Sequence, residues 1–299
     1  MDSSTLLDRV GNTPLVKLQN ITAHLPPSVE VWVKCEWFNP GGSVKDRAAS
    51  AIVRRAVADG ALDGRRLLDA SSGNTGIAYA WMGAQLGFGV TLCLPKNANA
   101  ERRRTLEAYG VEVVLTSPLE GSDGAILKAR ELAASDDYLY VDQYSNEANW
   151  RAHFQGTGPE IWRDTGGRVT HFVATLGTSG TFMGSSRFLQ QHGVHCTSVQ
   201  PESPFHGLEG LKHMESALVP AIYDPSVADA EIGAPTEESL EFVRRLARNE
   251  GLLAGVSSGA AVWAALQIAE SLDSGVVVTI LPDGGERYLS EPHVWEPDE

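Results

Sequence analysis

The stretch Asn39–Arg47, which reads Asn-Pro-Gly-Gly-Ser-Val-Lys-Asp-Arg, guides the interpretation of this 299-residue chain. Its Pro-Gly-Gly run follows an apolar segment, Val31–Val33, and permits a tight turn with close backbone approach. Ser43 suits the N-cap of a helix that continues through Ala48–Val53. The turn therefore delivers Lys45 into the first turn of a predicted helix.

A lysine in this place is unusual, because the positive end of the helix dipole disfavours its ammonium form. Burial would lower the pKa of Lys45 further, and a neutral lysine amine is the nucleophile of Schiff-base chemistry. The nonapeptide alone leaves open an ordinary solvated lysine at the start of a helix. Other parts of the chain must decide between the two interpretations.

Charge and composition exclude several classes of function. The net charge is −14, from 24 basic and 38 acidic residues, which argues against a non-specific binder of nucleic acid. The hydrophobic content of 42% and the charged content of 21% are those of an ordinary soluble protein. No apolar run approaches the roughly 20 residues that span a bilayer. We therefore expect neither a nucleic-acid partner nor a membrane partner.

The three cysteines, Cys35, Cys93 and Cys196, are widely spaced. The chain has no Cys-x-x-Cys pair and no Cys/His cluster, so no zinc or other metal site is expected. Buried thiols in a reducing compartment are the simplest interpretation. Residues 1–4 lack the basic start of a signal peptide, and we predict a cytoplasmic protein.

Short apolar runs alternate with amphipathic helical patterns along the chain, which is typical of parallel sheets covered by helices on both faces. Strands are predicted at 30–36, 66–69, 90–94, 112–115, 138–141, 172–176, 197–200 and 276–281. Helices are predicted at 45–59, 75–86, 100–109, 123–134, 147–163, 236–249 and 258–271. The fold class is therefore α/β.

Two loops, Ser71–Gly76 and Gly177–Thr181, each follow a predicted strand and open a helix. Hydroxyls and backbone amides at a helix N-terminus bind carboxylates or phosphates. The second loop lacks the Gly-Lys-Ser/Thr ending of a P-loop, and the chain lacks the Gly-x-Gly-x-x-Gly fingerprint of dinucleotide oxidoreductases. From the residues alone, simple helix caps and tight turns remain open.

Together with the Lys45 stretch, these loops resemble, in the expected order, the motifs of the cysteine synthase branch of the fold-type II pyridoxal-phosphate (PLP) enzymes. Gly255–Gly259, Val10–Leu15 and Gly285–Ser290 resemble the same family. The resemblance spans nearly the whole chain. It implies a fold like that of the tryptophan synthase β subunit, with two lobes, each a largely parallel sheet flanked by helices, and the cofactor in the cleft between them.

The resemblance also implies a domain organisation. Residues 1–145 are expected to form the small lobe, and residues 146–299 the lobe that binds the cofactor phosphate. Residues 1–35 are expected to cross over to the C-terminal lobe. Residues 87–134 are expected to form a mobile lid over the substrate, and such lids exclude water from reactive intermediates.

Roles for individual residues follow from the same resemblance. Lys45 is expected to hold PLP as a Schiff base and then to remove the α-proton of the substrate. The other implied cofactor contacts are Asn74 at the ring hydroxyl, Ser257 at the pyridine nitrogen, and Gly177, Thr178, Ser179, Gly180 and Thr181 around the phosphate. The implied substrate contacts are Ser71, Ser72, Thr75, Gln143 and Lys212.

Some of these positions depart from the family pattern. Ser71 stands where many members carry threonine, and Ser179 replaces the glycine of A-type synthases. Lys212 stands where B-type members carry arginine, so the resemblance favours the B-type. A cation there can receive a second negative charge, although a solvated loop lysine remains open. The turn Asp283–Gly285 is assigned no chemistry.

The implied activity is a β-replacement that forms L-cysteine or S-sulfocysteine through an α-aminoacrylate. Its substrates are O-acetyl-L-serine or O-phospho-L-serine and a sulfur donor, which is sulfide, thiosulfate or a protein thiocarboxylate. A serine/threonine dehydratase, a cystathionine β-synthase-like enzyme and a non-enzymatic PLP-binding partner remain as alternatives. A homodimer is expected, with serine acetyltransferase or a sulfur-carrier protein as possible partners.

Overall fold

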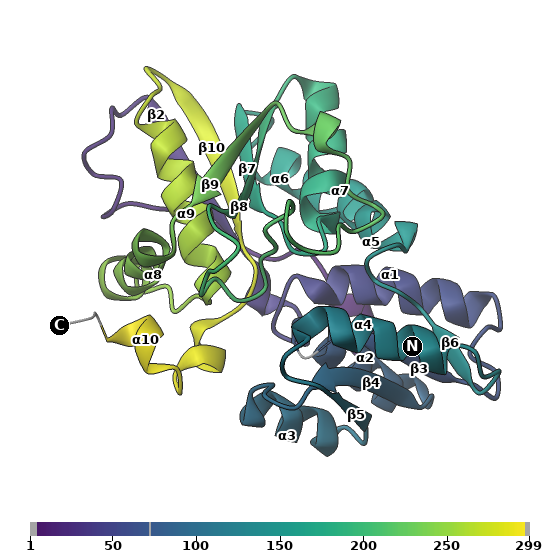
Figure 1. Cartoon of the computed structure of the whole chain (residues 1–299). Helices are drawn as coiled ribbons and strands as arrows, with labels where there is room; N and C mark the ends of the chain where they lie inside the picture. The colour runs from purple at the N-terminus through teal and green to yellow at the C-terminus, as the bar shows by residue number, and fades with distance from the viewer. Residues whose placement is uncertain (1–4, 72, 297–299) are drawn as a thin grey trace.

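The computed structural model of the chain describes residues 5–71 and 73–296. Ser72, one of the predicted substrate contacts, lies outside the described residues. Two lobes are visible, each built on its own sheet (Figure 1). This arrangement positions the site, because the cleft between the lobes contains the carboxyl ends of strands from both sheets.

The larger sheet has six strands. In spatial order they are β1 (Leu15–Lys17), β2 (Val29–Cys35), β10 (Gly275–Leu281), β7 (His171–Thr175), β8 (His195–Pro201) and β9 (Ala230–Ala234). Only β1 runs antiparallel to its neighbour. The first two strands therefore belong to this sheet, and the chain passes from β2 to the small lobe through Asn39–Arg47. The division at residues 145 and 146 stays a prediction.

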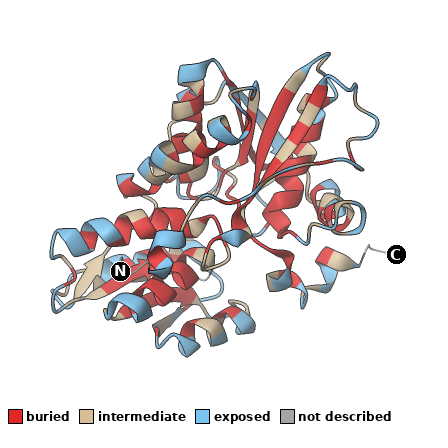
Figure 2. Ribbon diagram, turned by 180° about the vertical axis from the view of Figure 1, so that it is seen from behind, coloured by how far each residue is buried: buried red, intermediate tan, exposed pale blue. Residues whose placement is uncertain are grey.

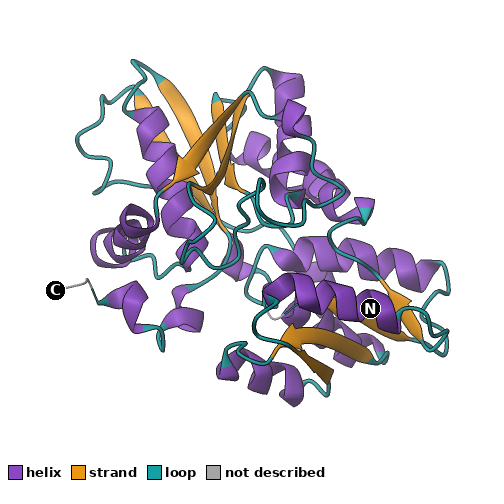
Figure 3. Ribbon diagram, in the orientation of Figure 1, coloured by secondary structure: helices purple, strands orange, loops and turns teal. Residues whose placement is uncertain are grey.

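The smaller sheet has four parallel strands, in the order β5 (Glu112–Thr116), β4 (Val90–Pro95), β3 (Arg66–Ala70) and β6 (Tyr138–Tyr140). Figure 3 shows how helices surround both sheets. The predicted α/β fold with two largely parallel sheets is confirmed.

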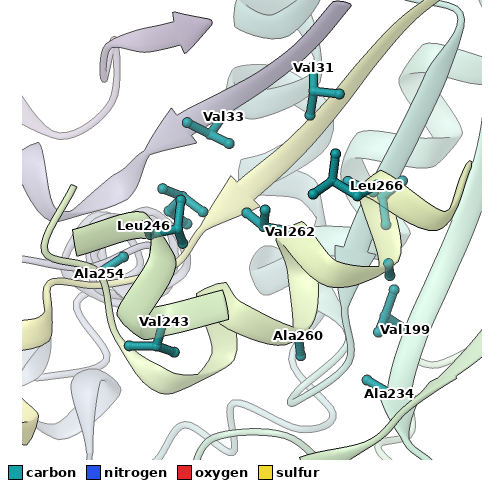
Figure 4. Close-up of a cluster of buried hydrophobic side chains, with 14 of the residues drawn as sticks. Val31, Val33, Val199, Ala234, Val243, Leu246, Ala254, Ala260, Val262 and Leu266 are labelled. Carbon is teal, nitrogen blue, oxygen red and sulfur yellow. The ribbon is translucent and has the colours of Figure 1, made fainter. Parts of the chain in front are cut away.

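Helices cover both faces of the larger sheet. On one face lie α5 (Glu147–Ala152), α6 (Gly158–Asp164) and α7 (Gly180–Leu189), and on the other lie α8 (Thr236–Arg245) and α9 (Val256–Ala269), with the short α10 (Pro292–Trp295) beyond them. Figure 4 shows Val31 and Val33 of β2 on the same core as Val262 and Leu266 of α9. Because α9 is packed nearly all round, its sequence is apolar on every side.

The smaller sheet follows the same principle. Leu67 packs with α1 (Lys45–Ala58), α2 (Asn74–Leu86) and α3 (Ala100–Ala108), whereas the next residue, Leu68, packs with α4 (Gly121–Leu132) on the opposite face. Alternate residues of a strand point to opposite faces, so a strand buried on both sides reads as a continuous apolar run. Figure 2 shows buried residues concentrated in both sheets and on the helix faces that cover them.

The strand order reverses once in each sheet. In the small sheet the chain runs outward from β3 to β4 and β5, and then returns to β6 on the other side of β3. In the large sheet it runs from β7 to β8 and β9, and returns to β10 beside β7. Ligands of parallel sheets bind outside the carboxyl ends of the strands at such reversals. The segments there are Ser71 after β3, Gln143 after β6, Gly177 after β7 and Asp283 after β10.

The predicted elements differ from the structure in a few places. The edge strands β1 and β9 have no counterpart in the prediction, because they lie at the margins of the sheet and lack a buried apolar run. The single helix predicted at 147–163 is α5 and α6 joined by a π-helical turn, His153–Thr157. No helix within residues 5–71 and 73–296 has the length and apolar character needed to cross a bilayer.

Candidate active site

The cleft between the lobes holds two adjoining cavities. The larger, of about 270 Å³, is lined by residues that include Lys45, Ser71, Asn74, Thr75, Arg102, Gln143, Gly177, Thr178, Lys212 and Tyr288. The smaller is lined by residues that include Lys45, Asn74, Thr178, Ser179, Thr181, Ser257 and Asp283. Apart from the undescribed Ser72 and the buried Gly180, every predicted site residue lines one or both cavities.

Lys45 begins α1 and faces both cavities. The Oγ atom of Ser43 accepts a hydrogen bond from the Lys45 backbone N–H at 3.3 Å. Burial lowers the pKa of the Lys45 amine, while the negative charges of Asp283 and Glu36 oppose that shift. The direction agrees with the expectation from the sequence, and it favours the neutral amine that removes protons and attacks carbonyls.

The Gly177–Thr181 loop forms a concave cradle at the N-terminus of α7. A side chain at position 177 would put its Cβ 2.4 Å from the backbone oxygen of Gly210, and one at position 180 would put it 1.9 Å from Asn149 Oδ1. At position 177 the obstacle is backbone, so only glycine fits, and at position 180 a side chain would displace the buried Asn149 amide. The Asn149 amide also donates to Thr178 Oγ1 at 3.1 Å and so orients that hydroxyl.

Ser179 has a left-handed backbone, with φ of +68°. Non-glycine residues adopt this conformation at a cost. Its Oγ is buried, and nothing in residues 5–71 and 73–296 hydrogen-bonds to it. A buried hydroxyl left over at a helix N-terminus suits an incoming phosphate.

The Ser71–Gly76 loop opens α2 in the small lobe. Ser71 Oγ accepts backbone N–H bonds from Gly73 at 3.3 Å and Gly76 at 3.1 Å, so its own hydroxyl proton can be donated to a ligand. Thr75 donates its hydroxyl proton to Gln143 Oε1 at 2.7 Å. The Thr75 hydroxyl proton is thus already donated within the chain, and Gln143 both supports this loop and lines the cavity.

Lys212 comes from the loop that follows β8 and is only 9% exposed. Its Nζ lies 3.6 Å from Asp123 Oδ1 and 5.3 Å from the centre of the Tyr144 ring. This burial removes the interpretation of Lys212 as a solvated loop lysine. A buried ammonium that is only loosely paired remains able to receive an anion.

The remaining two predicted cofactor contacts come from opposite lobes. Asn74 begins α2, and Arg287 and Asp283 of the large lobe bond the two ends of its side-chain amide. Ser257 lies in the first turn of α9, is buried, and lines the smaller cavity. The serine side chain is neutral, and the sequence had placed a neutral group at this position.

Two charged residues of this site, Asp283 and Arg102, were not predicted from the sequence. Asp283 is 1% exposed, although its turn was assigned no chemistry. Arg102 of α3 is buried, forms an ion pair with Glu209 of the large lobe, and lies 5.2 Å from the centre of the Tyr288 ring. The predicted strand 276–281 ends just before Asp283 and could have drawn attention to it. That strand lies beside β7, however, and this neighbour is set by the strand order, which the sequence does not show.

A family model of pyridoxal-phosphate dependent enzymes matches residues 6–283. A cysteine synthase from Aquifex aeolicus is 49% identical over 296 residues, covering 96% of this chain and 90% of that protein. The chain belongs to the cysteine synthase family of PLP-dependent enzymes. Cysteine synthase B from Pseudomonas aeruginosa is 43% identical over 96% of each chain. The crystal structure of a cysteine synthase from Entamoeba histolytica superposes with a TM-score of 0.93, at 34% identity, covering 99% of this chain and 91% of that one.

These similarities confirm the resemblance found in the sequence, the fold type, the dependence on PLP and the assignment as a cysteine synthase. The chemistry of the site agrees with that cofactor. The glycine cradle and the unpartnered Ser179 hydroxyl suit its phosphate, and Lys45 stands at the same cavity with a pKa lowered by burial. The residues present therefore fit PLP.

Proposed function

We propose that this protein forms L-cysteine from O-acetyl-L-serine and sulfide, with Lys45 as its catalytic residue. The observation that carries the proposal is the place of Lys45, which lines both cavities between a loop suited to a phosphate and a loop suited to a carboxylate. A cofactor phosphate and a substrate carboxylate bound there would put the reacting atoms beside one amine.

Lys45 would hold the cofactor covalently, and residues 177–181 would hold its phosphate. Asn74 would bond the ring hydroxyl, and Ser257 would face the ring nitrogen. When bound, PLP supplies an electron sink for the pair released from the substrate Cα–H bond. Because Ser257 is neutral and cannot protonate the ring nitrogen as an aspartate does, it keeps that sink weak, which favours β-elimination over transamination.

The chain's own groups would position and deprotonate the substrate. The Ser71 hydroxyl and the backbone N–H of Thr75 would hold the carboxylate, supported by Gln143, and the contact predicted for Ser72 stays a prediction. The substrate amine would first displace Lys45, and the freed neutral amine of Lys45 would then take the α-proton while acetate leaves from Cβ. Sulfide would add at Cβ, and Lys45 would return the proton to Cα, which completes the replacement.

The leaving group and the sulfur donor depend on Lys212. Its burial and its long 3.6 Å pairing with Asp123 support a role in binding a second negative charge. O-phospho-L-serine, thiosulfate (giving S-sulfocysteine) and a protein thiocarboxylate each bring such a charge. If Lys212 serves this purpose, K212A should lose activity with O-phosphoserine or thiosulfate more than with O-acetylserine and sulfide, whereas an equal loss would assign Lys212 to packing.

Residues 87–134 would close over the substrate. Three side chains of this segment support the idea by contacting the large lobe: Arg102 pairs with Glu209, Asn99 bonds Glu291 at 3.0 Å, and Asp123 faces Lys212. The assembly and location expected from the sequence are part of the proposal: a cytoplasmic homodimer with serine acetyltransferase or a sulfur-carrier protein as partner. The buried free thiols of Cys35, Cys93 and Cys196 suit a reducing compartment.

The test is a product assay on the PLP-saturated protein with O-acetylserine and sulfide. We expect cysteine from the wild type and at least a thousandfold loss in K45A, because the covalent anchor and the base are the same group. Release of pyruvate without cysteine would identify a dehydratase. Turnover only with homocysteine would identify a cystathionine β-synthase. No turnover with any of these substrates would favour the remaining alternative, a PLP-binding partner without enzymatic activity.

A further inference from the structure

The two ends of the Asn74 side-chain amide are bound by groups of opposite charge. Its Nδ2 donates to Asp283 Oδ2 at 2.7 Å, and its Oδ1 accepts from Arg287 Nη1. A carboxylate only accepts hydrogen bonds and a guanidinium only donates them. A flipped amide would place oxygen against oxygen and N–H against N–H. These two neighbours therefore allow one orientation of the amide.

This orientation leaves one donor of Asn74 available. The amide nitrogen carries two N–H groups, and within the described chain only the one toward Asp283 is used. Asn74 also lines both cavities of the site. The remaining N–H is the group that would bond the cofactor's ring hydroxyl, the role proposed above for Asn74.

Asp283 is itself held rigidly. Its Oδ2 also accepts the Tyr288 hydroxyl at 2.9 Å, and its backbone oxygen accepts the Gly255 N–H at 3.0 Å. Its other carboxylate oxygen, Oδ1, packs so closely on Gly255 that a Cβ there would lie 2.0 Å away. A β-bridge joins Asp283 to Ser43, two residues before Lys45. Through its backbone and its carboxylate, Asp283 thus contacts the segments that carry Lys45, Asn74 and Ser257.

We propose that Asp283 is a positioning residue of this enzyme, whose carboxylate fixes the Asn74 amide so that one N–H points to the cofactor ring. Because Asn74 belongs to the small lobe and Asp283 to the large lobe, this hydrogen bond also sets the distance between the lobes at the site. The inference rests on the proposed cofactor role of Asn74, and it assigns chemistry to a turn that the motifs leave without any.

The test is a double-mutant cycle read by PLP affinity, measured by equilibrium dialysis without substrate. We expect D283A to weaken PLP binding about tenfold, the usual loss for a hydrogen bond to a charged group. D283N should also weaken it and shift the pH dependence of the bound cofactor's visible absorbance, because an amide at 283 can donate as well as accept. In the N74A background, D283A should change the affinity less than about twofold.

The matched control is E291A, which removes the acceptor of another hydrogen bond between the lobes, the one from Asn99 to Glu291, and should leave PLP affinity unchanged. An equal loss from D283A in the wild-type and N74A backgrounds would overturn the inference, as would PLP binding by N74A that matches the wild type. Either result is independent of cysteine formation by the wild type, so a failure here is distinct from a failure of the proposed function. Circular dichroism shows whether D283A folds. If it does not, the PLP affinity of D283N, measured in the same way, takes its place in the test.

Discussion

Arg47 Nε lies 2.6 Å from Glu36 Oε2, and neither side chain is more than 4% exposed. The same guanidinium bonds both carboxylate oxygens of Glu160, and Glu160 in turn pairs with the buried Lys34 at 2.9 Å. Arg47 belongs to α1, Glu36 follows β2, and Glu160 lies in α6, so the network joins the start of the small lobe to the large lobe.

Replacing Arg47 by leucine should destabilise the protein strongly. The change leaves Glu36 charged and buried without its main partner, which costs about 3–5 kcal/mol. The measurement is urea unfolding followed by circular dichroism. The control is R54L, which removes an ion pair with Asp8 whose side chains are 51% and 46% exposed, so the free energy of unfolding should change far less than in R47L. Equal losses in the two variants would contradict the stabilising role of the network.

Two variants of Ser179 should separate the effect of backbone strain on stability from the effect of the hydroxyl on phosphate binding. S179G relieves the left-handed backbone and should stabilise the protein by about 1 kcal/mol. It also removes the buried hydroxyl, so PLP affinity should fall about tenfold. S179A is the control, because it loses the hydroxyl and keeps the strain; it should bind PLP as weakly as S179G without the gain in stability. If both variants bind PLP like the wild type, the hydroxyl makes no contact with the phosphate.

Asp69 should make stability depend on pH. Burial raises the pKa of this carboxyl from its ordinary 3.8 to about 7. Since the folded state then holds a proton that the unfolded state has released, its contribution is present below pH 4 and is lost as the pH rises to about 7. The free energy of unfolding of D69N minus that of the wild type should therefore be higher at pH 8 than at pH 4. The expected increase is a few kcal/mol, since one pKa unit corresponds to about 1.4 kcal/mol. Urea unfolding at both pH values measures this, and a difference independent of pH would refute it.

The contact between Arg102 and Glu209 should help to hold the lid segment closed. E209Q weakens this partly exposed pair, and the KM for O-acetylserine should rise about two- to fivefold, the effect of roughly 0.5–1 kcal/mol. The control is E107Q, which changes an exposed carboxylate on α3, the helix that carries Arg102, and should leave KM unchanged. An unchanged KM in E209Q would argue against closure through this pair.

Local sequence patterns predicted the interior of both sheets and the loops that follow them. The reason is physical: a strand buried on both faces must be apolar throughout, as in Val276–Leu281, and a loop that meets a helix start needs glycine and hydroxyl residues, as in Gly177–Thr181. Edge strands escape such patterns, and β9 reads Ala-Glu-Ile-Gly-Ala because water covers part of it.

Contacts across the cleft were beyond the reach of local patterns. Asp283 and Asn74 are separated by 209 residues, and Arg102 and Glu209 by 107. They meet because the strand order reverses at β3 and β7, and the sequence alone does not reveal that order. Lys212 is a mixed case, because the resemblance pointed to its position, whereas its burial depends on how its loop packs on Tyr144.

The most direct test of the account is to locate the lysine that holds the cofactor. PLP-saturated protein is reduced with borohydride, which makes the lysine–cofactor bond permanent, and its peptides are mapped by mass spectrometry. We expect the cofactor mass on the peptide that contains Lys45 and none on that peptide in K45A. Labelling of Lys34 or Lys212 in place of Lys45, or no labelled peptide in the wild type, would contradict it.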